Sequence, residues 1–298
     1  MSKISYWIQA SRLPSQLYIF LPLLLGQAVA SSINRRFSYW FFILIYLFGL
    51  FIQLTIVYAN DYADFKTDQF NNTYNMFSGG SRVLVENKIS PRVMIIAIKI
   101  LVLLNLFLSI FLATYYQRLL APFFIIISLF LIWAYSYPPL ELSYRGGGEF
   151  LQMLGVAFLL PLFGYYIQTG NFENFPWSII IVLLPNHLAS AFSTALPDYP
   201  SDKQFGKRTA AVIFNPNIIK IAIVTLNFMS IILLLSFNII NNTAGLFIMS
   251  LPVLINLSLL FLIKNSPAGS KRLNRFVFLN ILQLMFFLIV LTLYLFIF

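Results

Sequence analysis

Long apolar segments constrain this chain more than any other feature of its sequence. The runs IIIVLLP (residues 179–185) and FFLIVLTLYLFIF (286–298) contain no charged residue, in a chain that is 60% hydrophobic and only 9% charged. A water-soluble domain has too little interior to bury this much apolar surface. The sequence therefore predicts an integral membrane protein.

The apolar segments divide into about nine stretches of the length that a membrane helix needs. A helix that crosses the ~30 Å hydrocarbon layer requires about 20 mostly apolar residues. No linker separates the stretches into halves, so we expect an all-α, polytopic membrane bundle with one domain over residues 1–298. The predicted spans are 16–32, 38–59, 93–115, 119–136, 149–168, 177–196, 217–238, 245–263 and 275–298.

Two features of the N-terminal region and of the composition limit other interpretations. Ala28 to Ala30 follow an apolar run and resemble a signal-peptidase site behind the basic residues Lys3 and Arg12, but a retained first span is favoured because another span follows at once. The chain has no Cys, which excludes disulfides, thiolate metal sites and a cysteine nucleophile.

The distribution of basic residues predicts the orientation in the membrane. If the nine spans alternate, sixteen of the nineteen Lys and Arg residues fall on the side that holds the N-terminus, and only Arg35, Arg36 and Arg118 lie opposite. The positive-inside rule places the N-terminus and that side in the cytoplasm, as expected in a bacterial inner membrane. The net charge of +10 therefore requires no nucleic acid partner.

Acidic residues are concentrated on the same predicted side. Eight of the nine fall there, with only Glu173 opposite, although carboxylates contribute little to topology. The segment NDYADFKTD (60–68) closes the second span and, if helical, places Asn60, Asp64 and Asp68 at successive i, i+4 positions, with Asp61 beside them. One helix face therefore collects negative charge.

A second acidic cluster closes the sixth span. Asp198 and Asp202 in LPDYPSDKQFGKRT have i, i+4 spacing, although Pro200 between them makes a helical turn less certain. Like charges this close repel one another. Ordinary solvated loops are the alternative interpretation, but both clusters precede a glycine-and-cation segment (GGSR at 79–82 and GKRT at 206–209), which favours a site.

Magnesium suits these ligands, because it prefers oxygen donors and is usually held by one or two carboxylates, waters and substrate phosphates. An EF-hand lacks its spacing and terminal glutamate here, and zinc lacks cysteines and has one histidine. The cations nearby suit the oxygens of a diphosphate. They are Arg82, Arg145, Lys203, Lys207 and Arg208.

The paired motifs resemble those of the UbiA-type intramembrane prenyltransferases. That family pairs N-D-x-x-D-x-x-x-D after its second helix with D-x-x-x-D after its sixth, which here read NDYADFKTD and DYPSD. ASRLPSQ, GGSRVLVENKISP, AYSYPPLELSYRGGGEFL and SDKQFGKRTAAV extend the resemblance. NDY, GGSRVLVE and GKRT are most similar to the branch that prenylates 1,4-dihydroxy-2-naphthoate in menaquinone biosynthesis. Glu141 replaces a lysine of some members, which leaves Arg145 in that role or a different acceptor as alternatives.

The resemblance implies transfer of a polyprenyl group from its diphosphate to an aromatic acceptor, with a central cavity open to the cytoplasmic side. It assigns catalysis and Mg²⁺ binding to the motif residues and the diphosphate to nearby cations. The motif residues are Asn60, Asp61, Asp64, Asp68, Asp198 and Asp202, and the cations are Arg12, Arg82, Arg145, Lys203 and Lys207. The prenyl tail is expected in an apolar channel, where water cannot quench a carbocation.

Other functions stay open at this point. A glycerol phosphate ether-lipid precursor as acceptor, or cyclisation of the prenyl chain, fits the same motifs. A secondary transporter is disfavoured because transporter sites lie near the membrane midplane, whereas these acids lie at span ends. Within the spans, Asn186, His187 and Gln283 are either site groups or helix-joining hydrogen-bond partners. The sequence does not define an oligomeric state.

Overall fold

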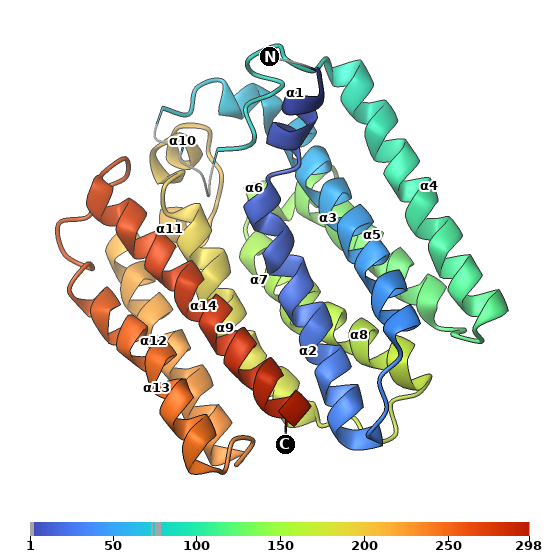
Figure 1. Ribbon diagram of the computed structural model, residues 1–298. Helices are drawn as coiled ribbons and strands as arrows, with labels where there is room; N and C mark the ends of the chain where they lie inside the picture. The colour runs from blue at the N-terminus through green and yellow to red at the C-terminus, as the bar shows by residue number, and fades with distance from the viewer. Residues whose placement is uncertain (1–2, 73, 75–78, 298) are drawn as a thin grey trace.

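The computed structural model describes residues 3–72, 74 and 79–297, and every regular element in this part of the chain is a helix. The helices run side by side as a bundle, with α1, α10 and the chain's N-terminal end at one end and the C-terminus at the other (Figure 1). We call the first of these the motif end. The predicted polytopic all-helical membrane bundle is confirmed.

Each of the nine predicted spans corresponds to a helix. Eight segments of the described chain are long and apolar enough to cross a membrane, and the ninth is the 16-residue helix α5. The long elements are α2 (Gln16–Asn34), α3 (Tyr39–Asp68), α4 (Pro91–Tyr115), α5 (Ala121–Ser136), α8 (Leu160–Thr169), α9 (Trp177–Ala195), α12 (Pro216–Ser236), α13 (Thr243–Leu260) and α14 (Lys271–Ile297). The short ones are α1 (Lys3–Ala10), α6 (Leu142–Arg145), α7 (Gly148–Met153), α10 (Tyr199–Gln204) and α11 (Ala210–Phe214).

The fifth span differs from a plain helix. Between α7 and α8 the chain forms a π-helix, η2 (Leu154–Leu159), which the hydropathy pattern did not predict. Pro161 has no amide to donate and its ring crowds the carbonyl one turn earlier, so a wider turn before it relieves the clash. The wider turn lies where the span faces the central cavity, which Gly155, Val156 and Leu159 line.

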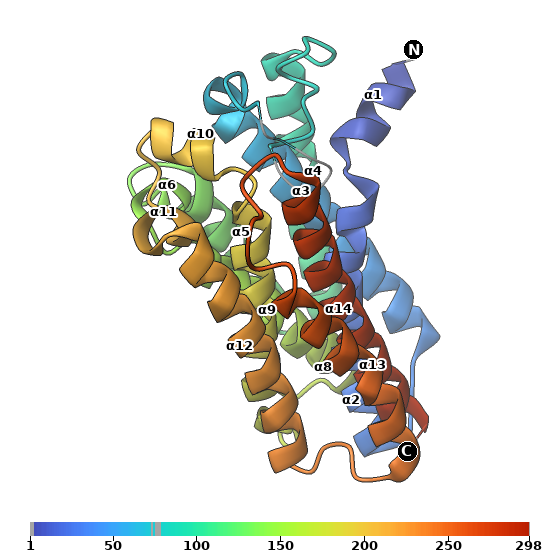
Figure 2. The same ribbon diagram turned by 90° about the vertical axis from the view of Figure 1, so that its left-hand side faces the viewer.

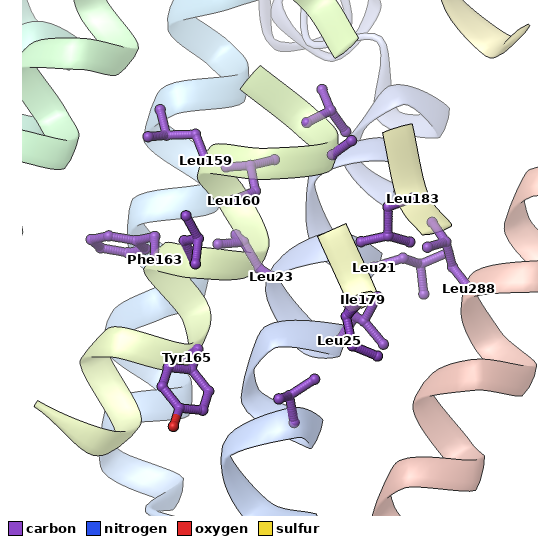
Figure 3. Packing of buried hydrophobic residues seen from close by; sticks show 14 of the residues in the cluster. Leu21, Leu23, Leu25, Leu159, Leu160, Phe163, Tyr165, Ile179, Leu183 and Leu288 are labelled. Carbon is purple, nitrogen blue, oxygen red and sulfur yellow. The ribbon is translucent and has the colours of Figure 1, made fainter. Parts of the chain in front are cut away.

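Neighbouring helices close a ring around that centre. α2 packs on α8 and α14, α9 packs on α7, α12 and α14, and α3 packs on α2 and α5. In the core, Leu21 and Leu25 of α2 lie near Ile179 and Leu183 of α9 (Figure 3). α4 lies at one edge of the bundle and α12 and α13 lie at the opposite edge (Figure 1), and the turned view again shows α10 and the C-terminus at opposite ends (Figure 2).

The contact between α2 and α8 is a backbone contact. A Cβ atom at Gly164 would lie 2.4 Å from the carbonyl oxygen of Leu23, and one at Gly26 would lie 2.0 Å from that of Pro161. Neither carbonyl belongs to a flexible side chain that can move away. Small residues of this kind allow membrane helices to approach closely.

We predict that Gly164→Ala destabilises the bundle, because the added methyl group forces α2 and α8 apart. Overpacking of this kind costs about 1–3 kcal/mol, which should appear as a lower thermal unfolding midpoint of the purified protein in detergent. Gly155→Ala is the matched control, since its Cβ would meet Leu131 at an ordinary 3.7 Å. Equal midpoints for the two variants would show that the close approach is not required.

Candidate functional site

The last turns of α3 carry the first acidic motif. Asn60, Asp64 and Asp68 face a central cavity, as their i, i+4 spacing predicts. Ser38 caps the start of this helix by accepting a hydrogen bond from the Phe41 amide, and the helix continues without a break to Asp68. The motif is thus part of the second span's helix and not a loop that follows it.

Asp61 points away from the cavity. Its carboxylate is 4% exposed and pairs with the Arg12 guanidinium. It also accepts hydrogen bonds from the Ser81 amide (3.1 Å) and from the Ser81 hydroxyl. In this arrangement Asp61 holds Arg12 and the glycine loop (residues 79–82) against α3, and its predicted role as a metal ligand stays a prediction.

Arg12 reaches Asp61 because the chain turns sharply between α1 and α2. Its φ is +45°, in the left-handed region that is uncommon for residues other than glycine. Leu13–Ser15 then form a short 3₁₀ turn that contains Pro14. Arg82, with φ +68°, is the other cavity-lining arginine in this conformation. Backbone strain of this kind is commonly concentrated at functional sites.

The glycine loop packs directly on the first motif. Gly80 has φ +74°, and a Cβ atom there would lie 2.3 Å from Oδ2 of Asp68. The Arg82 guanidinium donates to the backbone carbonyl of Asp68 and lies 4.4 Å from the centre of the Tyr74 ring. Only glycine allows the loop backbone this close to the carboxylate.

The second motif lies beside the first. The Asp202 amide donates to the Asp198 carbonyl (2.8 Å), so the turn is helical, and Pro200 is tolerated within its first turn. Asn71, three residues after Asp68, donates its side-chain amide to Oδ1 of Asp198 at 2.7 Å. This hydrogen bond directly links the chain segments that carry the two motifs.

Lys207 provides a second link. Its ammonium lies 3.0 Å from Oδ1 of Asp64 and 3.9 Å from Oδ1 of Asp202, so these oxygens are separated by at most the sum of the two distances, 6.9 Å. The Lys207 side chain is only 11% exposed and lies 4.3 Å from the centre of the Tyr144 ring. Tyr144 also donates its hydroxyl to Asp64 at 2.7 Å.

The electrostatics follow from this crowding. Burial raises the pKa of Asp202 to about 7, and repulsion from the Asp198 and Asp64 carboxylates opposes the lowering effect of Lys207. Burial alone would lower the pKa of the Lys207 ammonium, but its acidic neighbours, Asp64 first among them, raise it above its usual value. The clustered carboxylates therefore favour a positive charge between them, and the Lys207 ammonium stays protonated there.

The cavity has a volume of about 920 Å³ and extends from the two motifs into the bundle. Its motif end is lined by Arg12, Asn60, Asp64, Asp68, Asn71, Arg82, Glu149, Asp198, Asp202 and Lys207. Its deeper part is mainly apolar, with Ile19, Ile52, Ile56, Leu131, Val156, Leu159, Leu160, Ile281 and Met285 among the lining residues. The cavity therefore suits a molecule with a polar head, which would lie at the motif end, and an apolar tail, which would lie in the deeper part.

Two predicted diphosphate ligands do not reach this cavity. Arg145 is 63% exposed and pairs with Glu141, and Lys203 is exposed near the ring of Tyr199. Their contact with the diphosphate stays a prediction, which the cavity lining does not support. Lys203 lies next to Asp202 in sequence, but the turn of α10 directs it to the surface.

Sequence reasoning missed three polar residues of the site. Asn71 and Tyr144 bind the acidic motifs, as described above, and Glu149 lines the cavity while it accepts the Ala210 amide at 2.7 Å. The i, i+3 spacing from Asp68 was an available signal for Asn71. Tyr144 carried no comparable signal, because its position depends on how α6 packs.

The oxygen donors suit a hard divalent cation more than zinc. Among the described residues, no group of three or more Asp, Glu, Cys or His side chains converges on a single point. The carboxylates instead face one another across the Lys207 ammonium and the Asn71 amide. A sparse set of this kind leaves coordination positions for water and phosphate oxygens, as Mg²⁺ usually requires.

Comparisons with known proteins agree with this arrangement. Residues 19–296 match the profile of the UbiA prenyltransferase family. The chain is 29% identical over 266 residues to the digeranylgeranylglyceryl phosphate synthase of Korarchaeum cryptofilum, an alignment that covers 88% of this chain and 86% of the relative.

Solved structures share the fold. A UbiA homologue from Archaeoglobus fulgidus bound to GPP and Mg²⁺ superposes with a TM-score of 0.69 at 19% identity, over 96% of this chain and 99% of that one. A UbiA homologue from Aeropyrum pernix gives 0.62 at 15% identity, over 90% and 94%. With the family profile spanning nearly the whole bundle, the chain belongs to the UbiA prenyltransferase family and is an integral membrane prenyltransferase.

Proposed function

We propose that the protein transfers a polyprenyl group from its diphosphate to an aromatic quinone precursor, 1,4-dihydroxy-2-naphthoate or a similar ring, with Mg²⁺ as cofactor. One observation carries the proposal: Lys207 and Asn71 bring the two acidic motifs together at the mouth of a mainly apolar cavity. The family relative from Archaeoglobus fulgidus is bound to GPP and Mg²⁺ at its own site, which supports this assignment.

The residues that would hold Mg²⁺ are Asn60, Asp64, Asp68, Asp198 and Asp202, which line the cavity with oxygen donors. When bound, the metal would neutralise the diphosphate as the allylic carbon–oxygen bond breaks. Asp61 would act indirectly, by orienting Arg12 toward the cavity.

The cavity cations would bind the diphosphate. Arg12, Arg82 and Lys207 are the Lys and Arg residues in the cavity lining of the described chain. Fixed cations stabilise developing negative charge most strongly where water is scarce. Lys207 is buried and held between two carboxylates, so it is already oriented for this role.

The apolar depth of the cavity would hold the prenyl tail and exclude water from the allylic centre. The prenyl tail would lie along aliphatic walls, among them those of Ile52, Leu131 and Leu159. By the charge asymmetry, the motif end faces the cytoplasm, and a bacterial inner membrane is the proposed location.

An aromatic acceptor is supported by the NDY, GGSRVLVE and GKRT segments and by the small number of cavity cations. A phosphorylated acceptor adds a second dianionic group that needs cations of its own. A glycerol phosphate acceptor is the second candidate, because the curated relative is named as a digeranylgeranylglyceryl phosphate synthase.

We predict that Asp64→Asn and Asp198→Asn each lower the turnover rate at least about a hundredfold, because each removes charge that holds the metal. The measurement is pyrophosphate release by the purified, folded protein at saturating prenyl diphosphate. Glu173→Gln, an exposed change on the opposite side, is the matched control. Near-normal turnover of either motif variant contradicts the site assignment.

Lys207 and Lys203 lie on the same segment and test the placement directly. Lys207→Met should raise the KM for prenyl diphosphate or lower kcat by roughly ten- to a hundredfold, since a buried charge-assisted contact is lost. Lys203→Met should change either constant by less than about threefold, as expected for an exposed side chain. Equal changes of KM or kcat in the two variants would show that Lys203 also contributes to the site.

The acceptor is tested by a panel assay. Purified protein is given Mg²⁺, labelled prenyl diphosphates of several lengths, and either aromatic acids or a glycerol phosphate ether precursor. We expect lipid-soluble product with dihydroxynaphthoate and loss of pyrophosphate release on chelation with EDTA. Product only with the glycerol phosphate establishes the second candidate, and pyrophosphate release together with a cyclic prenyl product in the absence of any acceptor indicates cyclisation.

A further inference from the structure

Three polar side chains from three different helices line the cavity below the motifs. Gln152 of α7 donates its side-chain amide to the Tyr18 hydroxyl of α2 at 3.4 Å, and the Ser190 hydroxyl of α9 lies next to that of Tyr18. All three residues line the cavity. We call them the mid-cavity trio.

Two buried polar residues with unmet hydrogen-bonding capacity lie near Tyr18 and Ser190, behind the cavity lining. His187 and Asn186 of α9 are at most 1% exposed, and within the described chain neither the Nε2 atom of His187 nor the Asn186 side-chain amide has a hydrogen-bond partner. The His187 ring lies 6.1 Å from that of Tyr18, and Asn186 is one turn before Ser190. Buried polar atoms without partners are rare and unfavourable, so a ligand or ordered water is expected nearby.

The π-helix adds an independent observation. η2 begins two residues after Gln152, and Leu151, Gln152, Gly155, Val156 and Leu159 all line the cavity. These residues have the i, i+1, i+4, i+5, i+8 spacing of one helix face, so the segment presents that face to the cavity. Short π-helical segments are rare and occur frequently at functional sites. Gln152 is therefore the polar member of a helix face that is otherwise apolar, directly before a π-helical segment.

The depth of the trio separates it from the diphosphate site. Ser190 lies five residues before the end of α9 at Ala195, about 7.5 Å along the helix axis, and Asp198 lies beyond that end. The cavity cations Arg12, Arg82 and Lys207 are all engaged with the motif end, where they contact residues of the acidic motifs. An oxygen that binds the trio is therefore neutral, a hydroxyl or a carbonyl, and not a phosphate.

We infer that the mid-cavity trio is a subsite for a neutral ring hydroxyl of the acceptor, on the side of the ring that faces away from the motifs. The inference rests on the proposed function. The reacting carbon must lie within about 3–3.5 Å of the allylic carbon, near the motifs. In dihydroxynaphthoate both hydroxyls are on the ring that is prenylated, so one of them can face the trio while the reacting carbon faces the motifs.

The test compares Tyr18→Phe, Ser190→Ala and Gln152→Leu with the unchanged protein. Each variant removes one hydrogen bond to the acceptor, so the KM for dihydroxynaphthoate should rise roughly three- to tenfold. The KM for prenyl diphosphate should stay within about twofold. Ser109→Ala is the matched control, because Ser109 is a buried membrane serine of α4 that bonds only the carbonyl of Leu106 in its own helix.

An acceptor analogue provides a readout that a structural role would not change. An analogue that lacks the ring hydroxyl facing the trio should bind the unchanged protein more weakly than dihydroxynaphthoate does, by equilibrium titration, and Tyr18→Phe or Ser190→Ala should not weaken it further. Thermal unfolding midpoints identify any variant that fails to fold, and the hydroxyl-only changes Tyr18→Phe and Ser190→Ala then decide the test.

The outcomes are distinct. Turnover with dihydroxynaphthoate and unchanged acceptor KM values in the folded variants overturns the inference but leaves the proposed function intact. Equal rises in both KM values also overturn it, since they indicate a general disturbance of the cavity. Absence of turnover with every aromatic acceptor overturns the proposed function and this inference with it.

Discussion

Repulsion among carboxylates at the mouth of an apolar cavity is the constraint on which the rest of the site depends. Asp64, Asp68, Asp198 and Asp202 line one end of the cavity, where burial strengthens their mutual repulsion. Two contacts offset this repulsion. The Lys207 ammonium lies between the two motifs, and the Asn71 side-chain amide donates a hydrogen bond to Asp198. The loops that deliver these groups are therefore as necessary to the site as the motifs.

The sequence predicted the fold because hydropathy and charge act over whole segments. Each of the nine apolar stretches forms a helix, and the i, i+4 spacing correctly directed Asn60, Asp64 and Asp68 to one face. The same spacing rule did not distinguish Asp61, whose partners Arg12 and Ser81 come from distant segments. Helix periodicity fixes a face, but only the packing of neighbouring segments determines what that face meets.

The positions of side chains on loops were harder to predict from the sequence, because they too depend on how neighbouring segments pack. Arg145, Lys203 and Lys207 looked equivalent as cations near glycines, yet only Lys207 lies in the cavity lining. The difference arises from a single turn: the Lys207 amide donates to the Asp202 carbonyl at 2.8 Å, which folds the chain back over the motif. The π-helix likewise depends on local backbone geometry that a hydropathy pattern does not encode.

The placement of polar groups along the cavity separates charged groups at the motif end from neutral hydrogen-bonding groups deeper in the bundle. Cations contact only the motif end, while the Tyr18, Gln152 and Ser190 side chains lie deeper and carry no charge. A buried charge at that depth would need a counterion, whereas neutral hydrogen-bonding groups need only a partner of matching geometry. An apolar tail can therefore pass these groups at little electrostatic cost, and a ring oxygen can still be held in register with the allylic carbon.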